Sequence, residues 1–553
     1  MLKKVLSFLV CALFVLTSAV SLAEDGTFTG TADGFGGTIT VEVTVKDGVI
    51  TDLEVHGEKE TPEIGGAALE TLIAAILEEG SAEDVEAVTG ATWTSKGVFA
   101  AVLNALGLET EEAGEAAEAS AVSSLNHGLG VVVTPRLGPG RDDLDVPVYS
   151  FNVVMAYVLT DDEQRVVDME ADILEIITPN HDGAEDNVLA GWPGAKYNND
   201  EDADGAVDGT FEQTEENFTE NLPEWKTKRQ LGSAYKMNSG TWEQEMDIFE
   251  AFFRGKTLEE IETFFEKHCS DRNGRPIFEG TTNEQDLAKW NALTGEEKAE
   301  MDALTGATMS LSDAHGDLLG AIRKAMNGQE PVDADQAVAC LGLGTVVTPR
   351  LGPGKDDQDV PVYSFNVVMA GALFDAEARA VAVKEDILEI ITPNHDSAED
   401  NVFIGWPGQT YNSDDDGDGK VDGIAEQTEE SFTGMLPLFR TKRELGNLYK
   451  MNSGTWAQEM DIFERFFAGK TLEEIQAFMA VHASSRNGRV IFEGNTNETD
   501  LAKWNALTDE EKAEVDALTG ATMSLTDAHG NLLGALEKAL ENARVSFITV
   551  GQD

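Results

Sequence analysis

A heptapeptide rich in hydroxyl groups occurs three times and is the pattern in this chain best suited to chemistry. It reads Glu-Ala-Val-Thr-Gly-Ala-Thr at residues 86–92 and Asp-Ala-Leu-Thr-Gly-Ala-Thr at residues 302–308 and 516–522. A further hydroxyl residue follows each copy, and an apolar pattern with helical spacing comes after it. The sequence therefore predicts, at each copy, a Gly-containing turn that leads into the N-terminus of a helix.

Such a turn is suited to binding an anion. The first turn of a helix has unpaired N–H groups and the positive end of the helix dipole, and Gly lets the backbone approach a bulky group closely. A Thr in this position can be a helix cap, a phosphate ligand or a point of covalent attachment. The candidate site residues are Thr89, Gly90, Ala91 and Thr92, then Thr305, Gly306, Ala307 and Thr308, and finally Thr519, Gly520, Ala521 and Thr522.

The heptapeptide resembles the acceptor motif of the FMN-binding domain family, which has an acidic residue three positions before Ser/Thr-Gly-Ala-Thr. The resemblance implies that an FAD:protein FMN transferase couples FMN through its phosphate to the hydroxyl of Thr92, Thr308 and Thr522, giving FMN phosphoryl threonine. The second and third copies match the motif fully, whereas the first has Glu86 where Asp is usual. The alternative is that each Thr only caps a helix.

The residues before the first copy have the pattern of a small α+β domain. Apolar and polar side chains alternate from Thr38 to Val45, which predicts a half-buried strand, and Asp47-Gly48 indicates a hairpin to a second strand. A loop at residues 60–65 precedes a helix with regularly spaced apolar residues. This unit resembles the small FMN-binding domain, although Glu63 replaces a Gly that is frequent in the family's loop.

The rest of the chain is a duplication. From about residue 126, each residue matches the one 214 positions later without a gap, as Thr134 matches Thr348. A period this long indicates two domains. Each repeat is expected to start with a strand, a turn at its equivalent of Asp161-Asp162-Glu163, and a partner strand, which is the order found in the small unit.

Each repeat also contains an insert that the small unit lacks. Capping boxes at Thr241 with Gln244 and Thr257 with Glu260 predict two helices in it, and Gly255 is suited to end the first. After the insert, a capping box at Thr294 with Glu297 predicts the helix that leads to the Thr-Gly-Ala-Thr turn. The apolar spacing of Trp242, Met246, Phe249 and Phe253 predicts one buried face. The repeats resemble secreted flavoproteins of Gram-positive bacteria that carry tandem FMN-binding-type domains and take part in extracellular electron transfer.

We therefore expect an α+β chain of three FMN-binding-type domains, one small and two enlarged by a helical insert. The expected boundaries are a signal peptide at 1–23, the small domain at 24–108, a linker at 109–122, the first enlarged repeat at 123–327, a linker at 328–337 and the second enlarged repeat at 338–553.

Composition indicates where such a chain works. Lys3 and Lys4, the apolar run to about Val20 and the small-x-small site at residues 21–23 are typical of a secretory signal. We expect no transmembrane segment after signal cleavage, and thus an extracytoplasmic protein, secreted or associated with the cell surface. A net charge of -63 excludes a general nucleic-acid-binding role.

An acidic loop in each repeat is a candidate calcium site. Its alternating carboxylates are Asp200, Asp202, Asp204 and Asp208 in the first repeat, and Asp414, Asp416, Asp418 and Asp422 in the second. This spacing favours Ca²⁺, but Phe211 and Ala425 stand where an EF-hand requires Glu. A calcium site and a solvated acidic turn both remain open.

Three further groups of residues have alternative interpretations. His181 and His395 fit a metal site or a surface turn, and His315 and His529, expected on the helix after the turn, could tune a flavin or pack in the core. Arg136 and Arg350 could pair with a ligand phosphate or an internal acid. Cys269 and Cys340 have Ala483 and Asn126 as counterparts, so a repeated disulfide framework is excluded, and one bridge between them stays open.

The function we expect is that of a multi-flavin electron carrier. It would relay electrons from a membrane NADH dehydrogenase or another donor to external acceptors or a partner reductase. Gly128-Leu129-Gly130 lacks the strand–turn–helix context of a dinucleotide site, so we expect no NAD(P)H binding. The alternatives are an extracellular flavin-dependent reductase of a small molecule, which would make the chain an enzyme, and a calcium-stabilised cell-surface module without flavin.

Overall fold

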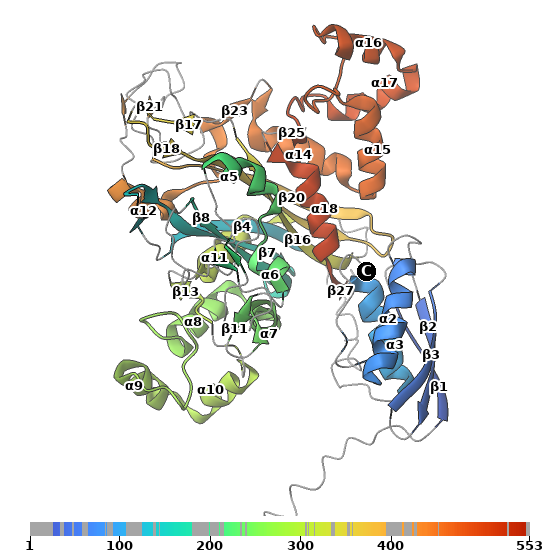
Figure 1. Cartoon of the computed structure of the whole chain (residues 1–553), viewed down its shortest axis with the longest axis vertical. Coiled ribbons are helices and arrows are strands. Elements are labelled where there is room, and N and C mark those ends of the chain that lie inside the picture. The colour runs from blue at the N-terminus through green and yellow to red at the C-terminus, as the bar shows by residue number, and fades with distance from the viewer. Residues whose placement is uncertain are drawn as a thin grey trace, which may run out of the picture. The chain divides into compact units, whose positions relative to one another are not determined.

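The structure, a computed structural model, has an α+β fold in which antiparallel sheets are covered by helices (Figure 1). The chain divides into two units, residues 1–120 and 121–553. The structure describes residues 26–548 apart from 34–37, 47–48, 58–64, 83–84, 86–91, 107–123, 137–139, 143, 180–197, 200–208, 211–214, 233–234, 238–239, 305–306, 308, 314–315, 333–337, 351–353, 357, 394–411, 414–422, 425–428, 452 and 528–529. The expected signal peptide thus lies outside the described residues.

The first unit is a three-stranded antiparallel sheet, in the order β1-β2-β3, with two helices packed on one face. Its elements are β1 (Gly26–Asp33), β2 (Thr38–Lys46), β3 (Val49–His56), α2 (Gly65–Glu79) and α3 (Thr92–Leu106). The buried side chains of Ile39, Val41 and Val43 alternate with more exposed polar ones along β2, which confirms the predicted strand.

Both repeats lie in the second unit and have the same order of elements. Each has a four-stranded antiparallel sheet, ordered β15-β4-β7-β8 in the first repeat and β20-β19-β16-β27 in the second. The strands are β4 (Asn126–Pro135), β7 (Ser150–Thr160), β8 (Val166–Ile177) and β15 (Glu330–Pro331), then β16 (Val338–Pro349), β19 (Ser364–Phe374), β20 (Ala380–Ile391) and β27 (Arg544–Ile548). Strand β15 therefore lies within the linker expected at 328–337.

Short elements connect and cover these sheets. The helices of the first repeat are α5 (Glu215–Asn221), η1 (Leu222–Glu224), α6 (Lys228–Leu231), α7 (Trp242–Phe253), α8 (Leu258–His268), α9 (Glu284–Ala292), α10 (Gly295–Glu300), η3 (Met301–Leu304) and α11 (Leu318–Asn327). Those of the second are α12 (Glu429–Met435), η4 (Leu436–Leu438), α13 (Lys442–Leu445), η5 (Gly446–Leu448), α14 (Trp456–Phe467), α15 (Leu472–His482), α16 (Glu498–Ala506), α17 (Asp509–Val515), η6 (Asp516–Leu518) and α18 (Leu532–Asn542). The two-residue strand pairs are β5 (Gly140–Arg141) with β6 (Pro147–Val148), β9 (Asn198–Asn199) with β10 (Gly209–Thr210), β11 (Lys236–Met237) with β12 (Gly240–Thr241), β13 (Ser312–Asp313) with β14 (Gly316–Asp317), β17 (Gly354–Lys355) with β18 (Pro361–Val362), β21 (Asn412–Ser413) with β22 (Gly423–Ile424), β23 (Lys450–Met451) with β24 (Gly454–Thr455), and β25 (Thr526–Asp527) with β26 (Gly530–Asn531).

The predicted capping boxes form as expected. The side chains of Thr241, Thr257 and Thr294 each accept a hydrogen bond from the backbone N–H of the residue three positions on. The side chain of that residue in turn accepts a hydrogen bond from the backbone N–H of the Thr. Helix α7 ends at Phe253 with Arg254 as its C-cap, and Gly255 follows with a φ of +76°. Gly adopts this left-handed conformation without the steric cost that a β-carbon brings, which is why it ends the helix here.

One close contact between a helix and a strand recurs in all three sheets. A β-carbon on Gly30 of β1 would lie 2.2 Å from the carbonyl oxygen of Ala101 in α3. In the first repeat, a β-carbon on Gly130 would lie 2.0 Å from the carbonyl oxygen of Ala321. In the second repeat, a β-carbon on Gly344 would lie 2.1 Å from the carbonyl oxygen of Ala535. The helix that follows each Thr-Gly-Ala-Thr turn thus lies directly on a Gly of the first strand of its sheet.

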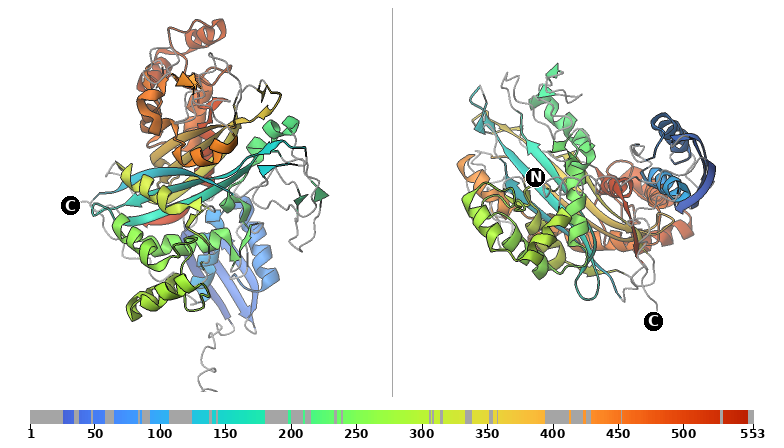
Figure 2. Two further views of the ribbon diagram at one scale, coloured as in Figure 1. Left: turned by 90° about the vertical axis from the view of Figure 1, so that its left-hand side faces the viewer. Right: turned by 90° about the horizontal axis from the view of Figure 1, so that it is seen from below.

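The two repeats pack together through their sheets (Figure 2). Along β7, Val153 and Met155 enter a core shared with the second repeat, whereas Val154 and Ala156 enter a core formed with the repeat's own helices. Both faces of the strand are buried, which explains why it reads as an apolar run without alternation. Helices α8 to α10 and α15 to α17 lie on opposite outer sides of the paired sheets.

Aromatic side chains of each repeat also pack against the sheet of the other. Phe218 of α5 packs against Tyr363 and Phe365 in the opposite sheet, and Phe432 of α12 packs against Tyr149 and Phe151. Ion pairs accompany each exchange, and they join Arg141 to Glu429 and Lys355 to Glu215. Each of these contacts has its counterpart 214 residues away, so in this region the two repeats are related like the halves of a symmetric dimer.

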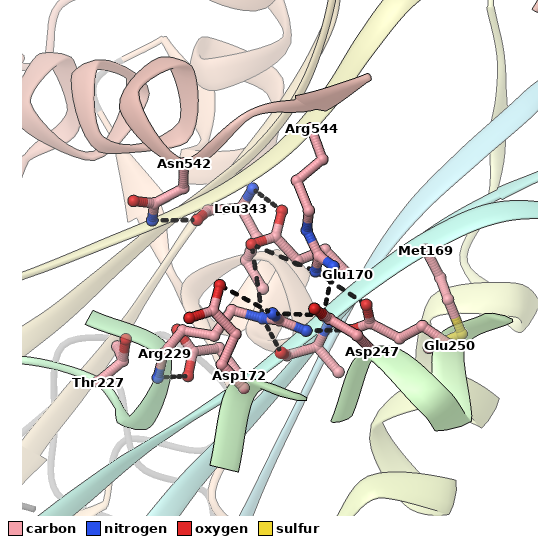
Figure 3. A network of polar contacts seen from close by, with 12 residues as sticks. Met169, Glu170, Asp172, Thr227, Arg229, Asp247, Glu250, Leu343, Asn542 and Arg544 are labelled. Atoms are coloured by element: carbon pink, nitrogen blue, oxygen red, sulfur yellow. Dashed lines mark hydrogen bonds and ion pairs between the residues drawn. The ribbon is translucent and has the colours of Figure 1, made fainter. Parts of the chain in front are cut away.

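A buried polar network breaks this symmetry (Figure 3). Arg544 of the second repeat lies 2.8 Å from Glu250 and 3.9 Å from Glu170, both in the first repeat. At the equivalent positions, Lys384 pairs with Glu330, so the signs of the two charges are reversed. Burial raises the pKa of Glu170 to about 8, and the nearby Arg544 and Arg229 guanidinium groups oppose that rise.

None of the helices in the described part of the chain has the length and apolarity that crossing a bilayer requires.

Candidate functional site

The third Thr-Gly-Ala-Thr turn is described completely. Thr508 caps α17 through a capping box, η6 follows, and the chain then turns at Gly520, whose φ is +98°. The Ala521 N–H donates to the Leu518 oxygen at 3.0 Å, and the Ala521 side chain is buried. Thr522 is half-buried at the end of the turn, where its hydroxyl is the functional group of interest.

A carboxylate from another helix holds this hydroxyl. The Thr522 Oγ1 donates to Glu459, at 3.0 Å from each carboxylate oxygen, and the Thr522 N–H donates to Glu459 Oε2 at 2.7 Å. Glu459 is buried in the first turn of α14, whose N-terminus is fixed by a capping box between Thr455 and Gln458. The turn is therefore positioned against α14, with a protein carboxylate in the place where an anion was expected.

The predicted helix N-terminus is correct for the first copy and wrong for the other two. Helix α3 begins at Thr92 itself. In the repeats, a β-hairpin separates the turn from the next helix, so that α11 begins at Leu318 and α18 at Leu532. The Thr522 N–H points to Glu459 instead of a helix axis. In the second repeat the partner of the turn is therefore Glu459 of α14, and not the N-terminus of the helix that follows.

The other two copies are only partly described. Thr89, Gly90 and Ala91 lie outside the described residues, as do Thr305, Gly306 and Thr308. Ala307 is described and buried, as its counterpart Ala521 is. The hydroxyl residues that follow the copies, Thr94, Ser310 and Ser524, are all buried and belong to the framework of the site.

A cavity of about 830 Å³ lies beside the second turn. Leu304 and Ala307 of the turn line it together with Trp290 of α9 and Phe278, whose side chain is 54% exposed. The Lys298 Nζ lies 5.3 Å from the centre of the Trp290 ring. The lining is mixed, with Glu279, Asn291 and Lys298 beside the apolar residues, and it offers a planar ligand an aromatic surface.

The second repeat has the same aromatic and cationic residues at the equivalent positions. Phe492 is 50% exposed, and the Lys512 Nζ lies 5.8 Å from the centre of the Trp504 ring. These residues were not among the site residues predicted from the sequence. The signal that could have found them is Trp-Asn-Ala-Leu-Thr at residues 290–294 and 504–508, a short distance before each acceptor motif.

Basic residues shared by the two repeats pair with internal acids. Arg136 lies 3.5 Å from Glu175, and Arg350 lies 3.5 Å from Glu389, so each pairs with an internal acid. Lys228 is buried and also pairs with Glu175, at 3.0 Å. The alternative of a ligand phosphate is thus not needed to account for either Arg.

Several other candidate residues cannot be placed. The acidic loops with Asp200, Asp202, Asp204, Asp208, Asp414, Asp416, Asp418 and Asp422 lie outside the described residues, and so do His181, His395, His315 and His529. The loops are bracketed by the strand pairs β9–β10 and β21–β22. Within the described residues, no group of His, Cys, Asp and Glu has the arrangement of a metal site. Cys269 and Cys340 are both buried and free.

Comparisons with known proteins agree with the motif. Residues 34–107 match the model of the FMN-binding domain family. The chain is also similar to a chlorophenol reductase of Desulfitobacterium hafniense, with 30% identity over 226 residues, which cover 39% of this chain and 62% of that protein. The small unit is therefore an FMN-binding domain, and the likeness to the reductase spans less than two thirds of that protein.

Proposed function

We propose that this chain, whose residues 34–107 form an FMN-binding domain, is an electron carrier with FMN attached to Thr92, Thr308 and Thr522. The observation that carries the proposal is the contact common to the three sheets. In each, the helix after the Thr-Gly-Ala-Thr turn packs on a Gly of the first strand. Because one of these cores is an FMN-binding domain, we take the other two as enlarged versions of it.

The described residues fit a covalently held flavin. Thr522 presents a half-buried hydroxyl next to Gly520, and the cavity beside Ala307 has the volume and aromatic lining that a planar ring requires. When bound, FMN supplies one- and two-electron redox chemistry. The chain would hold it in place, cover part of it and surround it with negative charge, given the net charge of -63.

The partners and location follow from the same proposal. An FAD:protein FMN transferase would attach the flavin, and a membrane NADH dehydrogenase or another membrane donor would reduce it. The reduced chain, outside the cytoplasm, would pass electrons to external acceptors or a partner reductase. The strongly acidic surface supports carriage between proteins over binding to nucleic acids or anionic membranes.

Mass spectrometry of the secreted protein tests the attachment. We expect one FMN phosphoryl adduct on each of Thr92, Thr308 and Thr522, and each Thr→Ala variant should lose only its own adduct. Thr526→Ala, which removes an exposed hydroxyl near the third site, is the matched control and should keep all three. A colourless protein without adducts would contradict the proposal and leave the calcium-stabilised module.

A flavin-dependent reductase is the second candidate, and two observations favour it. The similar protein is a chlorophenol reductase, and the cavity lined by Trp290 and Phe278 would also admit a small aromatic molecule. Reoxidation of the reduced protein separates the candidates. A carrier should react with many acceptors at comparable rates, whereas an enzyme should prefer one. If the chain is an enzyme, Trp290→Ala should lower its rate of reoxidation by the preferred acceptor, and if it is a carrier, the reoxidation rates should not change.

A further inference from the structure

The hydroxyl of Thr522 faces a proton acceptor from α14, a helix with no equivalent in the described part of the small FMN-binding domain. Both carboxylate oxygens of Glu459 lie 3.0 Å from Thr522 Oγ1. The hydroxyl proton thus points inward to the buried carboxylate, while the half-buried Thr522 keeps its oxygen lone pairs for an incoming reagent. We propose that Glu459 positions this hydroxyl and accepts its proton when FMN is attached, an inference that rests on the proposed function.

The reaction balances with FAD as the co-reactant. The Thr522 oxygen forms a bond to the phosphorus on the flavin side of FAD, the phosphoanhydride bond breaks, and AMP leaves with the bonding electrons. The hydroxyl proton passes to the Glu459 carboxylate, and nothing is oxidised or reduced. A carboxylate within hydrogen-bond distance of a hydroxyl is the arrangement required for general-base assistance.

The surroundings of Glu459 support this role. Its side chain is 1% exposed, so its position is fixed by packing, and it lies in the first turn of α14, where the helix dipole stabilises a negative charge. The Thr522 N–H binds one carboxylate oxygen at 2.7 Å and thereby holds the backbone of the acceptor residue in register. After transfer, the proton on Glu459 would avoid two adjacent negative charges, one on the carboxylate and one on the new phosphodiester.

The chain contains its own comparison sites. Glu245 is the counterpart of Glu459 in α7 and is equally buried, with 1% exposure, so it is expected to serve Thr308 in the same way. Thr92 begins α3 directly, and the described part of the small unit has no helix equivalent to α14. Thr92 should therefore not depend on either carboxylate.

The test is a time course of flavin attachment to the purified, unmodified full-length chain, with transferase and FAD at saturating concentrations. Peptide mass spectrometry follows the three threonines separately, so Thr92 is an internal standard. In Glu459→Gln we expect attachment at Thr522 to slow by about 100-fold relative to Thr92, with Thr308 unaffected. In Glu245→Gln the slow site should be Thr308.

Two further variants separate chemistry from structural damage. Gln458→Ala removes the capping-box partner next to Glu459 and should lower the thermal stability without slowing Thr522 selectively. Glu459→Asp keeps a carboxylate and should recover part of the rate. An unchanged rate at Thr522 in Glu459→Gln, or equal slowing in Gln458→Ala, would overturn the role of Glu459. A wild-type chain that gains no adduct even at Thr92 would instead overturn the proposed function.

Discussion

The ring of Tyr157 lies directly on Gly371, its own counterpart in the second repeat. A β-carbon at position 371 would be 2.2 Å from Tyr157 Cδ2, and the Tyr157 hydroxyl is 2.8 Å from His127 Nδ1. The Tyr157 ring thus occupies the space that a side chain at position 371 would need, so the same residue could not stand at both positions. Burial lowers the pKa of His127 to about 4, because the protonated ring would lose its hydration.

The first prediction follows from this contact. Gly371→Ala should destabilise the second unit by about 1–3 kcal/mol, because the tightly packed interior cannot make room for a methyl group against the Tyr157 ring. Gly434→Ala is the matched control, since a β-carbon there meets no atom within 4 Å. Because Gly434 lies in α12, Ala should leave the free energy of unfolding unchanged or raise it by up to about 1 kcal/mol. Urea denaturation measures both, and equal effects would contradict the prediction.

The reversed ion pairs give the second prediction. Arg544→Ala removes a partner of Glu250, which lies 2.8 Å away with a side chain 2% exposed, and should cost about 3 kcal/mol because a buried carboxylate loses part of its compensation. Glu330→Gln acts at the equivalent place, where the amide oxygen can still accept a hydrogen bond from the buried Lys384, so it should cost less than about 1 kcal/mol. Chemical denaturation of the two variants under the same conditions tests the difference, and a larger cost for Glu330→Gln would refute it.

A carboxyl group without a partner gives the third prediction. Glu385 is fully buried, and neither of its carboxylate oxygens has a hydrogen-bond partner among the described residues. Burial, aided by the negative charge of Glu464, raises the pKa of Glu385 well above its ordinary value. The folded state therefore holds this proton more tightly than the unfolded state, and stability is lost as the pH rises above the ordinary carboxyl range.

Glu385→Ala should remove that loss. The counterpart in the first repeat is Ala171, so Ala is compatible with this place in the fold. The stability of the variant relative to the wild type should rise with pH, by up to about 1.4 kcal/mol per pH unit, until Glu385 ionises in the folded protein. Ala171→Glu should show the opposite trend. Thermal denaturation between acid and neutral pH measures both, and parallel profiles would be evidence against a buried neutral Glu385.

The fourth prediction concerns the two free thiols. Burial raises the pKa of both Cys269 and Cys340 to about 12, so little reactive thiolate exists near neutral pH. Alkylation of the native protein at pH 8 should be slower than in denaturant by about 100-fold or more at each thiol. Peptide mapping gives the rate for each Cys, and a disulfide between them, seen as loss of both reactive thiols in denaturant, would contradict the structure.

Local features of this protein could be predicted from the sequence. The alternation in β2 and the capping boxes of α7, α8 and α10 appear as expected, because each depends on residues a few positions apart. The turn at Gly520 was also predicted, but the hairpin after it was missed. Its strands have only two residues each, too short for any periodic signal.

Long-range contacts could not be read in the same way. Glu459 and Thr522 are 63 positions apart, and nothing in the helix pattern of α14 distinguishes this Glu from a solvent-exposed one. From the sequence, Gly128 and Gly130 suggested only a possible nucleotide motif. In the structure, they lack the side chains that would prevent α11 from lying against β4. The unbroken apolar run of β7 was a sign that both faces of its sheet would be covered.

Packing of the two sheets against each other also limits how many enlarged repeats such a protein can contain. Each four-stranded sheet has its own helices on one side and the opposite repeat on the other, so the pair is a finished assembly and not an open array. A single extra enlarged repeat would have to leave an apolar sheet surface in water, which favours aggregation. Longer relatives built on this plan should therefore add enlarged repeats two at a time, and small units one at a time.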